Sequence, residues 1–327
     1  MKKNLLLIYG GGGTEHDISI VSSKYLIESI NKEDFNIVEV EIAKDASWVY
    51  KEQKVQLDFN KDLVINAQKK ISIDFVVPCV HGFPGETGDL QSYFELIKLP
   101  YLGCNSESSK ICFNKALTKL WLDKVGINTT PFIILSEQST DSISEVKKFF
   151  VNEGPLFVKA SNQGSSVGCY PLIDIKEVDK ILKSAFELSD FVIIEKSIMG
   201  RELEVSTFEY KDQVHATKPG EIICPNKFYS FEEKYNKDSH TETFIEAKDL
   251  TSEQVKTIQD MAIKAFKTLK LSDLSRIDFF LTNDNKIYIN EINTFPGLTP
   301  ISMFPKMMEN YGVKFKDYLS ERFSLLK

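Results

Sequence analysis

Several features that define large classes of proteins are missing from this chain of 327 residues. No Gly-Lys-Ser or Gly-Lys-Thr occurs, which excludes the phosphate-binding loop of P-loop nucleotide hydrolases. No apolar stretch approaches the roughly 20 residues that cross a bilayer, and the apolar run 5–9 is too short for the core of a signal peptide. The sequence therefore predicts a protein that is neither exported nor embedded in a membrane, and we expect it in the cytoplasm.

Cysteine and positive charge are also scarce. The five thiols form no Cys-x-x-Cys pair and only His81 lies near any of them, so neither a zinc site nor a disulfide framework is expected. Acidic side chains outnumber basic ones by 47 to 40 and no Lys/Arg cluster occurs, which argues against a nucleic-acid partner. The hydrophobic share of 42% allows sizeable buried cores, and the length suits two or three domains.

The first hundred residues alternate between strand and helix patterns. Apolar runs at 4–9 and 74–80 and a β-rich run at 36–42 predict strands, and the stretch 15–30 predicts a helix. Continuous Val/Ile/Leu runs are typical of parallel strands buried on both faces. The pattern predicts an α/β fold in which residues 1–105 form a domain with an open parallel sheet.

The remaining residues predict two α+β units. A central unit over 106–200 and a C-terminal unit over 201–327 are expected, and the polar segment 227–243 is the only long loop, which makes it a candidate cover for an active site. The elements expected in these units are a helix over 108–125, strands over 156–159, 167–171, 191–195 and 202–209, a helix over 252–269, a β-hairpin over 275–293 and two short closing helices.

The hairpin carries the strongest chemical signal. Two apolar runs flank an Asn-Asp-Asn turn, and either a two-residue or a centred four-residue loop sets Asp278 opposite Glu291 and Arg276 opposite Asn293. Opposed carboxylates repel each other unless a cation neutralises them, and hard oxygen ligands suit Mg²⁺, which completes its octahedron with phosphate oxygens and water. The alternative is an exposed polar face at the end of a sheet.

Two glycine-rich loops and one histidine loop are further candidates. Residues 163–168 follow a strand that ends in Lys159, so their backbone N–H groups could wrap phosphate oxygens, although an ordinary turn would look the same. Residues 10–13 do not fit the dinucleotide pattern G-x-G-x-x-G, because its third glycine would fall on Glu15. Thr14 and Asp17 are expected to cap the following helix. Glu15 is placed to grip a ligand's ammonium group, whereas His81 is equally consistent with a structural role.

The motifs follow one another in a fixed order, at residues 11–19, 81–91, 159–168, 195–196, 200–202, 228–235, 276–278 and 291–299. In order and spacing this set resembles the D-alanine–D-alanine ligases of the ATP-grasp superfamily. The resemblance covers nearly the whole chain. It implies an N-terminal open parallel sheet followed by a two-part α+β ATP-grasp, and ligation of two D-alanine molecules through an acyl phosphate for peptidoglycan precursor synthesis.

The resemblance also implies roles for individual residues. ATP would be surrounded by Lys115, Lys159, Glu195, Lys196, Ile198 and Glu202, with Lys234 on the terminal phosphate. Two Mg²⁺ or Mn²⁺ ions would be held by Asp278, Glu291 and Asn293. The D-alanine substrates would meet Glu15, His81 and Ser302, with Arg276 and the Gly297 N–H on the acyl phosphate and the later oxyanion. Tyr235, together with Ser165 and Glu15, would position and deprotonate the amine, and similar ligases are commonly homodimers.

Some positions depart from the family pattern. Ala160 stands where proline is usual, and Asn114 where aspartate is usual. Ser230 and Phe231 replace a common Asp-Tyr, and Glu246 replaces a common proline. None of these is an expected metal ligand or the arginine, so they bear on substrate preference and turnover more than on the chemistry.

Three alternatives remain open. A related ligase could join D-alanine to D-lactate or D-serine, or join other amino acids, although Tyr235 favours the dipeptide. A nucleotide-binding regulator without catalysis would be expected to lack Arg276 or a metal carboxylate, and both are present. A dinucleotide-dependent oxidoreductase is disfavoured by Glu15.

Overall fold

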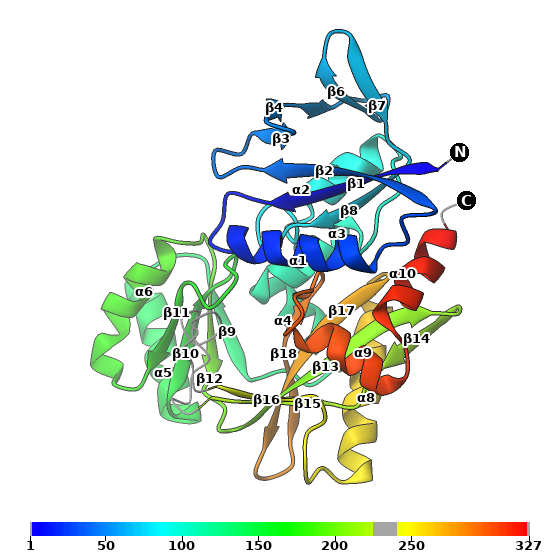
Figure 1. Cartoon of the computed structure of the whole chain (residues 1–327). Helices are drawn as coiled ribbons and strands as arrows, with labels where there is room; N and C mark the ends of the chain where they lie inside the picture. The colour runs from blue at the N-terminus through cyan, green and yellow to red at the C-terminus, as the bar shows by residue number, and fades with distance from the viewer. Residues whose placement is uncertain (1, 225–240, 326–327) are drawn as a thin grey trace.

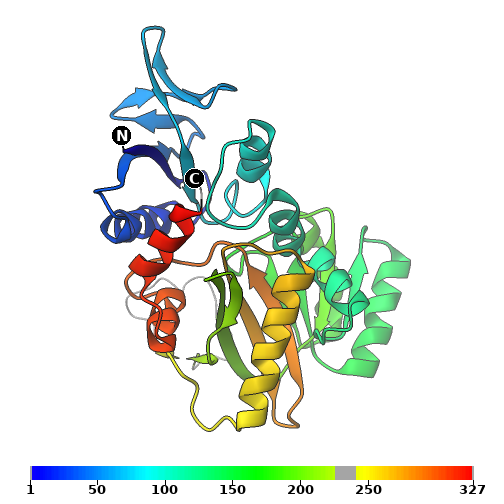
Figure 2. The same cartoon turned by 90° about the vertical axis from the view of Figure 1, so that its right-hand side faces the viewer.

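The computed structural model describes residues 2–224 and 241–325, which form a mixed α/β structure with an N-terminal sheet above two further sheets (Figure 1). Viewed from the side, helix α8 (Ser252–Thr268) lies along the outer face of the C-terminal sheet (Figure 2). None of the described helices is long and apolar enough to cross a membrane.

The N-terminal sheet has the order β4-β3-β2-β1-β8, and β1 (Lys3–Gly10) runs parallel to both β2 (Phe35–Ile42) and β8 (Phe75–Cys79). Alternate side chains of β1 pack against opposite layers, one containing α1 (His16–Ser29) and the other α2 (Asp89–Leu96). The predicted parallel sheet with two covered faces is therefore confirmed.

Residues 48–72 add structure that the sequence did not predict. Two short antiparallel strands extend the edge of the N-terminal sheet beyond β2, and three more form a separate small sheet. These strands are β3 (Trp48–Tyr50), β4 (Gln53–Lys54), β5 (Gln56–Leu57), β6 (Asp62–Asn66) and β7 (Lys69–Ser72).

The central sheet is antiparallel, with the order β11-β10-β12-β9. The predicted strands correspond to β10 (Leu156–Ala160), β11 (Cys169–Leu172) and β12 (Val192–Lys196), whereas β9 (Phe132–Leu135) was not predicted. Its apolar layer also contains side chains of α5 (Thr140–Glu153) and α6 (Val178–Phe186), the second of which follows the short 3₁₀ helix η1 (Ile175–Glu177).

The helix predicted over 108–125 is in fact two helices, α3 (Ser106–Phe113) and α4 (Lys115–Lys124). Asn114 separates them because its backbone is extended, with φ −83° and ψ 103°. Its side chain accepts a hydrogen bond from the Leu117 N–H at 3.0 Å, which caps α4. The break therefore starts a new helix at Lys115.

The C-terminal sheet has the order β16-β15-β13-β17-β18, with β14 paired to β13. Leu203 and Val205 of β13 pack in the core that contains α8, whereas Phe208 packs in the core that contains α9 and α10 on the opposite face. Helices α9 and α10 cover that second face around Ser206, Phe208 and Leu274, whereas Glu202 and Glu204 line a cavity. The remaining bounds are β13 (Gly200–Tyr210), β14 (Gln213–Ala216), β15 (Gly220–Ile223), β16 (Glu242–Phe244), β17 (Leu274–Thr282), β18 (Ile287–Asn293), α9 (Met303–Tyr311) and α10 (Phe315–Ser324).

A buried ion-pair cluster ties the last helix to the rest of the chain. Arg322 of α10 donates to Asp273 at 2.7 Å and to Glu209 at 3.0 Å. The second oxygen of Asp273 accepts from the Gly103 N–H at 2.6 Å, at the end of the N-terminal sheet region. Burial raises the pKa of Asp273 even though Arg322 opposes this shift. The buried Asp273 carboxylate is therefore stabilised by Arg322 and the Gly103 N–H.

We expect Arg322→Met to lower the free energy of unfolding by about 3 kcal/mol, because it leaves Asp273 buried without its cation. Urea denaturation followed by circular dichroism measures this change. The control is Lys256→Met, which removes an exposed pair with Asp260 and should cost well under 1 kcal/mol. Equal losses from the two variants would contradict the structural role of the cluster.

Candidate functional site

The β17–β18 hairpin brings the predicted residues together. Arg276 pairs with Asn293 and Asp278 pairs with Glu291, as predicted. The predicted turn is wrong, however. Thr282 pairs with Lys286 across a three-residue loop, which would shift the whole register by one residue. A β-bulge at Asn290 compensates, because the register changes between Asp278 and Phe279.

The bulge also adds a side chain to the site. Asn290 has no partner residue in the ladder, and its amide oxygen accepts from Lys159 at 3.2 Å. Asn290 and its neighbour Glu291 consequently both line the same cavity, although adjacent residues of a regular strand face opposite sides. The bulge thereby links the C-terminal hairpin to the central sheet.

Arg276 is fixed by carboxylates on its own sheet face. Its Nε and Nη2 donate to the two oxygens of Asp278, each at 2.8 Å, and its Nε lies 3.2 Å from Glu204 Oε1. Burial works against the charge, but Asp278 and Glu204 hold the pKa of Arg276 well above its usual value. The Asn293 amide nitrogen also donates to Asp278, at 3.1 Å. The guanidinium is thus always charged and cannot rotate freely.

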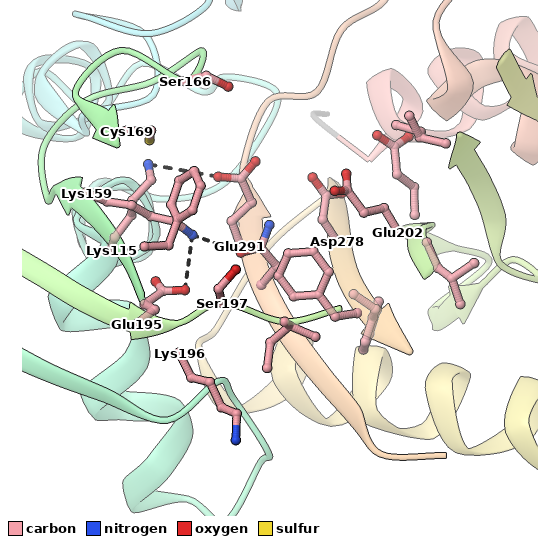
Figure 3. A pocket seen from close by; sticks show the side chains of 18 of the residues that line it. Lys115, Lys159, Ser166, Cys169, Glu195, Lys196, Ser197, Glu202, Asp278 and Glu291 are labelled. Carbon is pink, nitrogen blue, oxygen red and sulfur yellow. Dashed lines mark hydrogen bonds and ion pairs between the residues drawn. The ribbon is translucent and has the colours of Figure 1, made fainter. Parts of the chain in front are cut away.

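Arg276, Asp278 and Glu204 line a cavity between the central and C-terminal sheets, and Figure 3 shows it from close by. Lys159 Nζ lies 3.1 Å from Glu195 Oε2. Burial alone would lower the pKa of Lys159, but nearby negative charge, chiefly that of Glu195, outweighs burial and raises this pKa. Lys115 donates to the Gln163 carbonyl at 2.6 Å and lies 3.9 Å from Glu291. The predicted residues that line this cavity are Lys115, Lys159, Glu195, Lys196, Ile198, Glu202, Arg276, Asp278 and Glu291.

Lys196 differs from the other lysines in this set. Its ammonium pairs with Glu153 at 3.1 Å, and Figure 3 shows the side chain directed away from the other labelled residues. Lys234 and Tyr235 lie outside the described residues. Among the residues that are described, no group of three or more His, Cys, Asp or Glu side chains is arranged to hold a metal ion. Asp278 and Glu291 are the carboxylates that face each other in this hairpin, and Asn293 lies on the same face.

A second cavity of about 640 Å³ lies on the other side of loop 163–168, and Glu15, His81 and Gly164 line it. This volume is in the range of small-molecule sites. Glu15 accepts from Ser165 Oγ at 2.5 Å, which joins the N-terminal unit to the loop. His81 Nε2 lies 2.9 Å from Ser22 Oγ, and burial lowers the pKa of His81 although the charge of Glu15 opposes this.

The predicted cap of the first helix is wrong. The N-cap position is Glu15 rather than Thr14, and no side chain makes a capping hydrogen bond there. The reason is geometric, since the glycine turn places Glu15 at the helix start and its carboxylate turns to Ser165 instead. Ser165 itself has left-handed backbone geometry with φ 49°, as does Ser166 with φ 62°. Such strained residues are often found in ligand-binding loops.

Gly297 and Ser302 lie together beyond the end of β18. A Cβ on Gly297 would approach Ser302 Oγ to 3.1 Å, so a side chain there would crowd that hydroxyl. Ser302 Oγ accepts from the Thr299 N–H at 2.9 Å and lies 2.7 Å from Thr299 Oγ1. Hydrogen bonds between Thr299 and Ser302 therefore stabilise the turn before α9.

Four residues in or near the two cavities were not predicted from the sequence as parts of the site. Glu204 lies two residues after Glu202, so the period of a strand places both on one face. Lys119 lies one helical turn after Lys115 on α4. Glu86 was part of the His81 loop but received no role. The inclusion of Asn290 in the cavity depends on the bulge, for which the sequence carries no clear signal.

Glu86 provides a test of pH dependence. Burial and the charge of Glu15 raise its pKa to about 8. The folded state keeps this proton up to about pH 8, whereas the unfolded chain releases it near 4.5, so its contribution to stability is complete below pH 4.5 and is lost as the pH rises through 8. We expect Glu86→Gln to flatten the decline of stability between pH 5 and 8 in urea titrations. The exposed control Glu107→Gln should keep the parent slope, and a parent slope in Glu86→Gln would contradict the assignment.

Two departures from the family pattern have structural consequences. The Ala160 N–H donates to the Gly168 carbonyl at 2.8 Å, a bond that proline could not make, and this bond closes the base of loop 163–168. Glu246 forms an exposed ion pair with Lys218 at 2.5 Å. Ser230 and Phe231 lie outside the described residues.

Comparisons with known proteins agree over nearly the whole chain. The family model described as D-ala D-ala ligase N-terminus matches residues 4–104, and the one described as D-ala D-ala ligase C-terminus matches residues 121–323. A D-alanine–D-alanine ligase of Vibrio atlanticus is 51% identical over 318 residues, which are 97% of this chain and 96% of that protein.

Solved structures are similar as well. D-alanyl-alanine synthetase A from Vibrio cholerae matches with a TM-score of 0.94 and 45% identity, covering 99% of this chain and 98% of the other. The VanG D-Ala:D-Ser ligase from Enterococcus faecalis matches with a TM-score of 0.88 and 28% identity over 100% of both chains. The two antiparallel sheets and the lysine-lined cavity between them are those of an ATP-grasp protein. Within that class, the chain belongs to the D-alanine–D-alanine ligase family.

Proposed function

We propose that this protein uses ATP and Mg²⁺ to join two D-alanine molecules into D-alanyl-D-alanine, a precursor of peptidoglycan. The observation that carries the proposal is the pair of opposed carboxylates, Asp278 and Glu291, in one cavity with Lys159 and Arg276 in a chain of this ligase family. Family membership supports the overall reaction, and the site geometry supports the roles given below to the described residues. The roles of Lys234 and Tyr235 are supported by the family resemblance alone.

The nucleotide would occupy the cavity between the central and C-terminal sheets. Lys115 and Lys159 would attract its phosphates, because both ammonium groups are held at the cavity wall by nearby oxygens. Arg276 would stabilise the negative charge that develops as the first D-alanine carboxylate becomes an acyl phosphate. Its rotation is already restricted by Asp278 and Glu204, so little reorganisation is needed during the reaction.

The donor set of the hairpin fits Mg²⁺. Asp278 and Glu291 offer carboxylate oxygens, and because the Asn293 amide nitrogen is used by Asp278, the Asn293 amide oxygen is left for a cation. These hard oxygen ligands are few, which suits an ion that keeps water and phosphate oxygens in its coordination sphere. When bound, Mg²⁺ would neutralise phosphate charge; Mn²⁺ has a similar preference for oxygen.

The second cavity would hold the amino acids. Glu15 would bind the ammonium of the first D-alanine, and its bond to Ser165 would position the loop beside that substrate. The buried His81 would contribute to the wall of this subsite. Ser302 would meet the carboxylate of the second D-alanine and the Gly297 N–H would stabilise the oxyanion. We propose Tyr235 as the residue that helps deprotonate the incoming amine, and Lys234 as a partner of the terminal phosphate.

The decisive experiment is product analysis after mixing the protein with ATP, Mg²⁺ and D-alanine. We expect one ADP and one phosphate for each D-alanyl-D-alanine detected by mass spectrometry, with each of the three components required. L-alanine serves as the matched control and should give no dipeptide. ATP hydrolysis without any amide product would contradict the proposal.

A second candidate is ligation of D-alanine to D-serine. The match to a solved D-Ala:D-Ser ligase over the full length of both chains supports this candidate. Competition between equal amounts of D-alanine, D-serine and D-lactate separates these possibilities, and we expect the D-alanine dipeptide to predominate. We also propose that the protein works as a homodimer in the cytoplasm, where ATP is supplied; light scattering coupled to size-exclusion chromatography tests the dimer.

A further inference from the structure

Lys119 is an almost completely buried lysine behind the nucleotide cavity. Only 1% of its surface is exposed, and it lies on α4 one turn after Lys115. Its Nζ donates to Thr130 Oγ1 at 2.5 Å and lies 3.3 Å from Glu195 Oε2. Burying a lysine is costly, so its retention in a core position calls for an explanation.

Glu195 receives its protein donors on one oxygen. Lys119, Thr130 and Lys159 all approach Oε2, at 3.3, 2.9 and 3.1 Å. The other oxygen, Oε1, is buried and has no hydrogen-bond partner among the described residues. Buried carboxylate oxygens are normally satisfied, which indicates that a donor is supplied by a ligand. Glu195 belongs to the lining of the cavity, where such a donor could reach it.

The charges point to the same conclusion. With Lys119 present, the cluster of two ammonium groups and one carboxylate keeps one positive charge at the cavity wall. Without Lys119, Lys159 and Glu195 would neutralise each other, and Lys159 would be the one ammonium partner left to that carboxylate among the described residues. The Lys159 ammonium would then be held more tightly by Glu195 and be less available to a phosphate.

We propose that Lys119 is a positioning residue for the nucleotide: it anchors Oε2 of Glu195, so that Oε1 keeps its acceptor capacity for an N–H donor of the base and Lys159 keeps donor capacity for the phosphates. This inference rests on the proposed function only in taking the cavity as the nucleotide site. Lys119 itself does not touch the nucleotide.

The test compares Lys119→Met with the parent protein in the full chain. We expect the Kd of the non-hydrolysable analogue adenosine 5′-(β,γ-imido)triphosphate, measured by calorimetry with Mg²⁺, to rise about tenfold, and the KM for ATP to rise with it while kcat changes less than about threefold. The preference for ATP over GTP in kcat/KM should also fall about tenfold. Lys124→Met, on an exposed part of the same helix, is the matched control and should leave all these values unchanged.

Double substitution shows whether Lys119 acts through Glu195. In a protein that already carries Glu195→Gln, Lys119→Met should raise the Kd by less than about twofold. If the two residues acted independently, Lys119→Met would raise the Kd by the same factor in both proteins. The inference is overturned if Lys119→Met still raises the Kd tenfold on the Glu195→Gln background. It is also overturned if the single variant Lys119→Met folds and keeps the parental Kd and base preference. If Lys119→Met does not fold, Thr130→Val decides: a rise of about threefold in Kd supports the inference and a parental Kd overturns it. Calorimetry needs no turnover, so a failure of D-alanine ligation would be recognised separately.

Discussion

The Glu291→Gln substitution is expected to lower kcat by about a thousandfold without unfolding the protein. The change removes one of the two opposed carboxylates that we propose to hold Mg²⁺, and a metal ion stabilises transferring phosphate by several kcal/mol. A loss of about 4 kcal/mol in transition-state stabilisation corresponds to this factor. Stability should change little, since the lost 3.9 Å pair with Lys115 is offset by weaker repulsion of Asp278 and the side chain is 30% exposed.

Phosphate release at a series of Mg²⁺ concentrations measures the effect. The variant should need more Mg²⁺ and should not regain the parental rate at saturation. Asp284→Asn is the control, because Asp284 lies in the exposed turn of the same hairpin and pairs there with Thr282 and Lys286. A Glu291→Gln protein with parental rate and parental Mg²⁺ dependence would remove the hairpin from the metal site.

In the hairpin, the pairing of Asp278 with Glu291 was predicted correctly although the loop length was predicted wrongly. The alternation of polar and apolar residues indicates which face of each strand is polar. This pattern favours Asp278 opposite Glu291 for any length of the loop. It does not reveal that Asn285 adopts a left-handed conformation with φ 62°, which allows a three-residue loop. The bulge at Asn290 then restores the register, so two unpredicted features cancel each other.

Long periodic elements were predictable and short ones were not. Helix α8 starts at the predicted Ser252, where Thr251 and Gln254 form a capping box, a signal that is local in sequence. The strands of residues 48–72 have two to five residues each and polar neighbours, so neither period nor length distinguishes them from loops. The division of the helix at Asn114 was hidden for a related reason, because asparagine is tolerated inside helices and also caps them.

Side chains of the candidate site were predictable where they sit in a motif and were missed where they act through another residue. Lys159 and Glu195 could be named because both belong to segments with a family resemblance. Lys119 approaches Glu195 only after α4 packs behind the central sheet, a contact between residues 76 positions apart in the chain. Such a contact depends on tertiary packing and leaves no local signature in the sequence.

The second large effect is expected for Arg276→Lys, which keeps the positive charge but loses the planar fork. The guanidinium now donates through two nitrogens to Asp278, and a lysine cannot reproduce this geometry. We expect kcat to fall by about 100-fold to 1000-fold, as for loss of an oxyanion donor, with little change in the KM for ATP. Burst measurements of ADP formation would place the loss in formation of the acyl phosphate.

Charge balance must be separated from catalysis in this variant, because Arg276 also neutralises Asp278 and the buried Glu204. Arg276→Met would remove a cation that pairs with both carboxylates, so it should cost about 3 kcal/mol in stability as well as activity. Arg276→Lys should retain most of that stability. If Arg276→Lys kept the parental kcat, the arginine would serve only to balance its neighbouring carboxylates. If it lost kcat at parental stability, the oriented guanidinium would be required by the reaction itself, because the charge alone is still present.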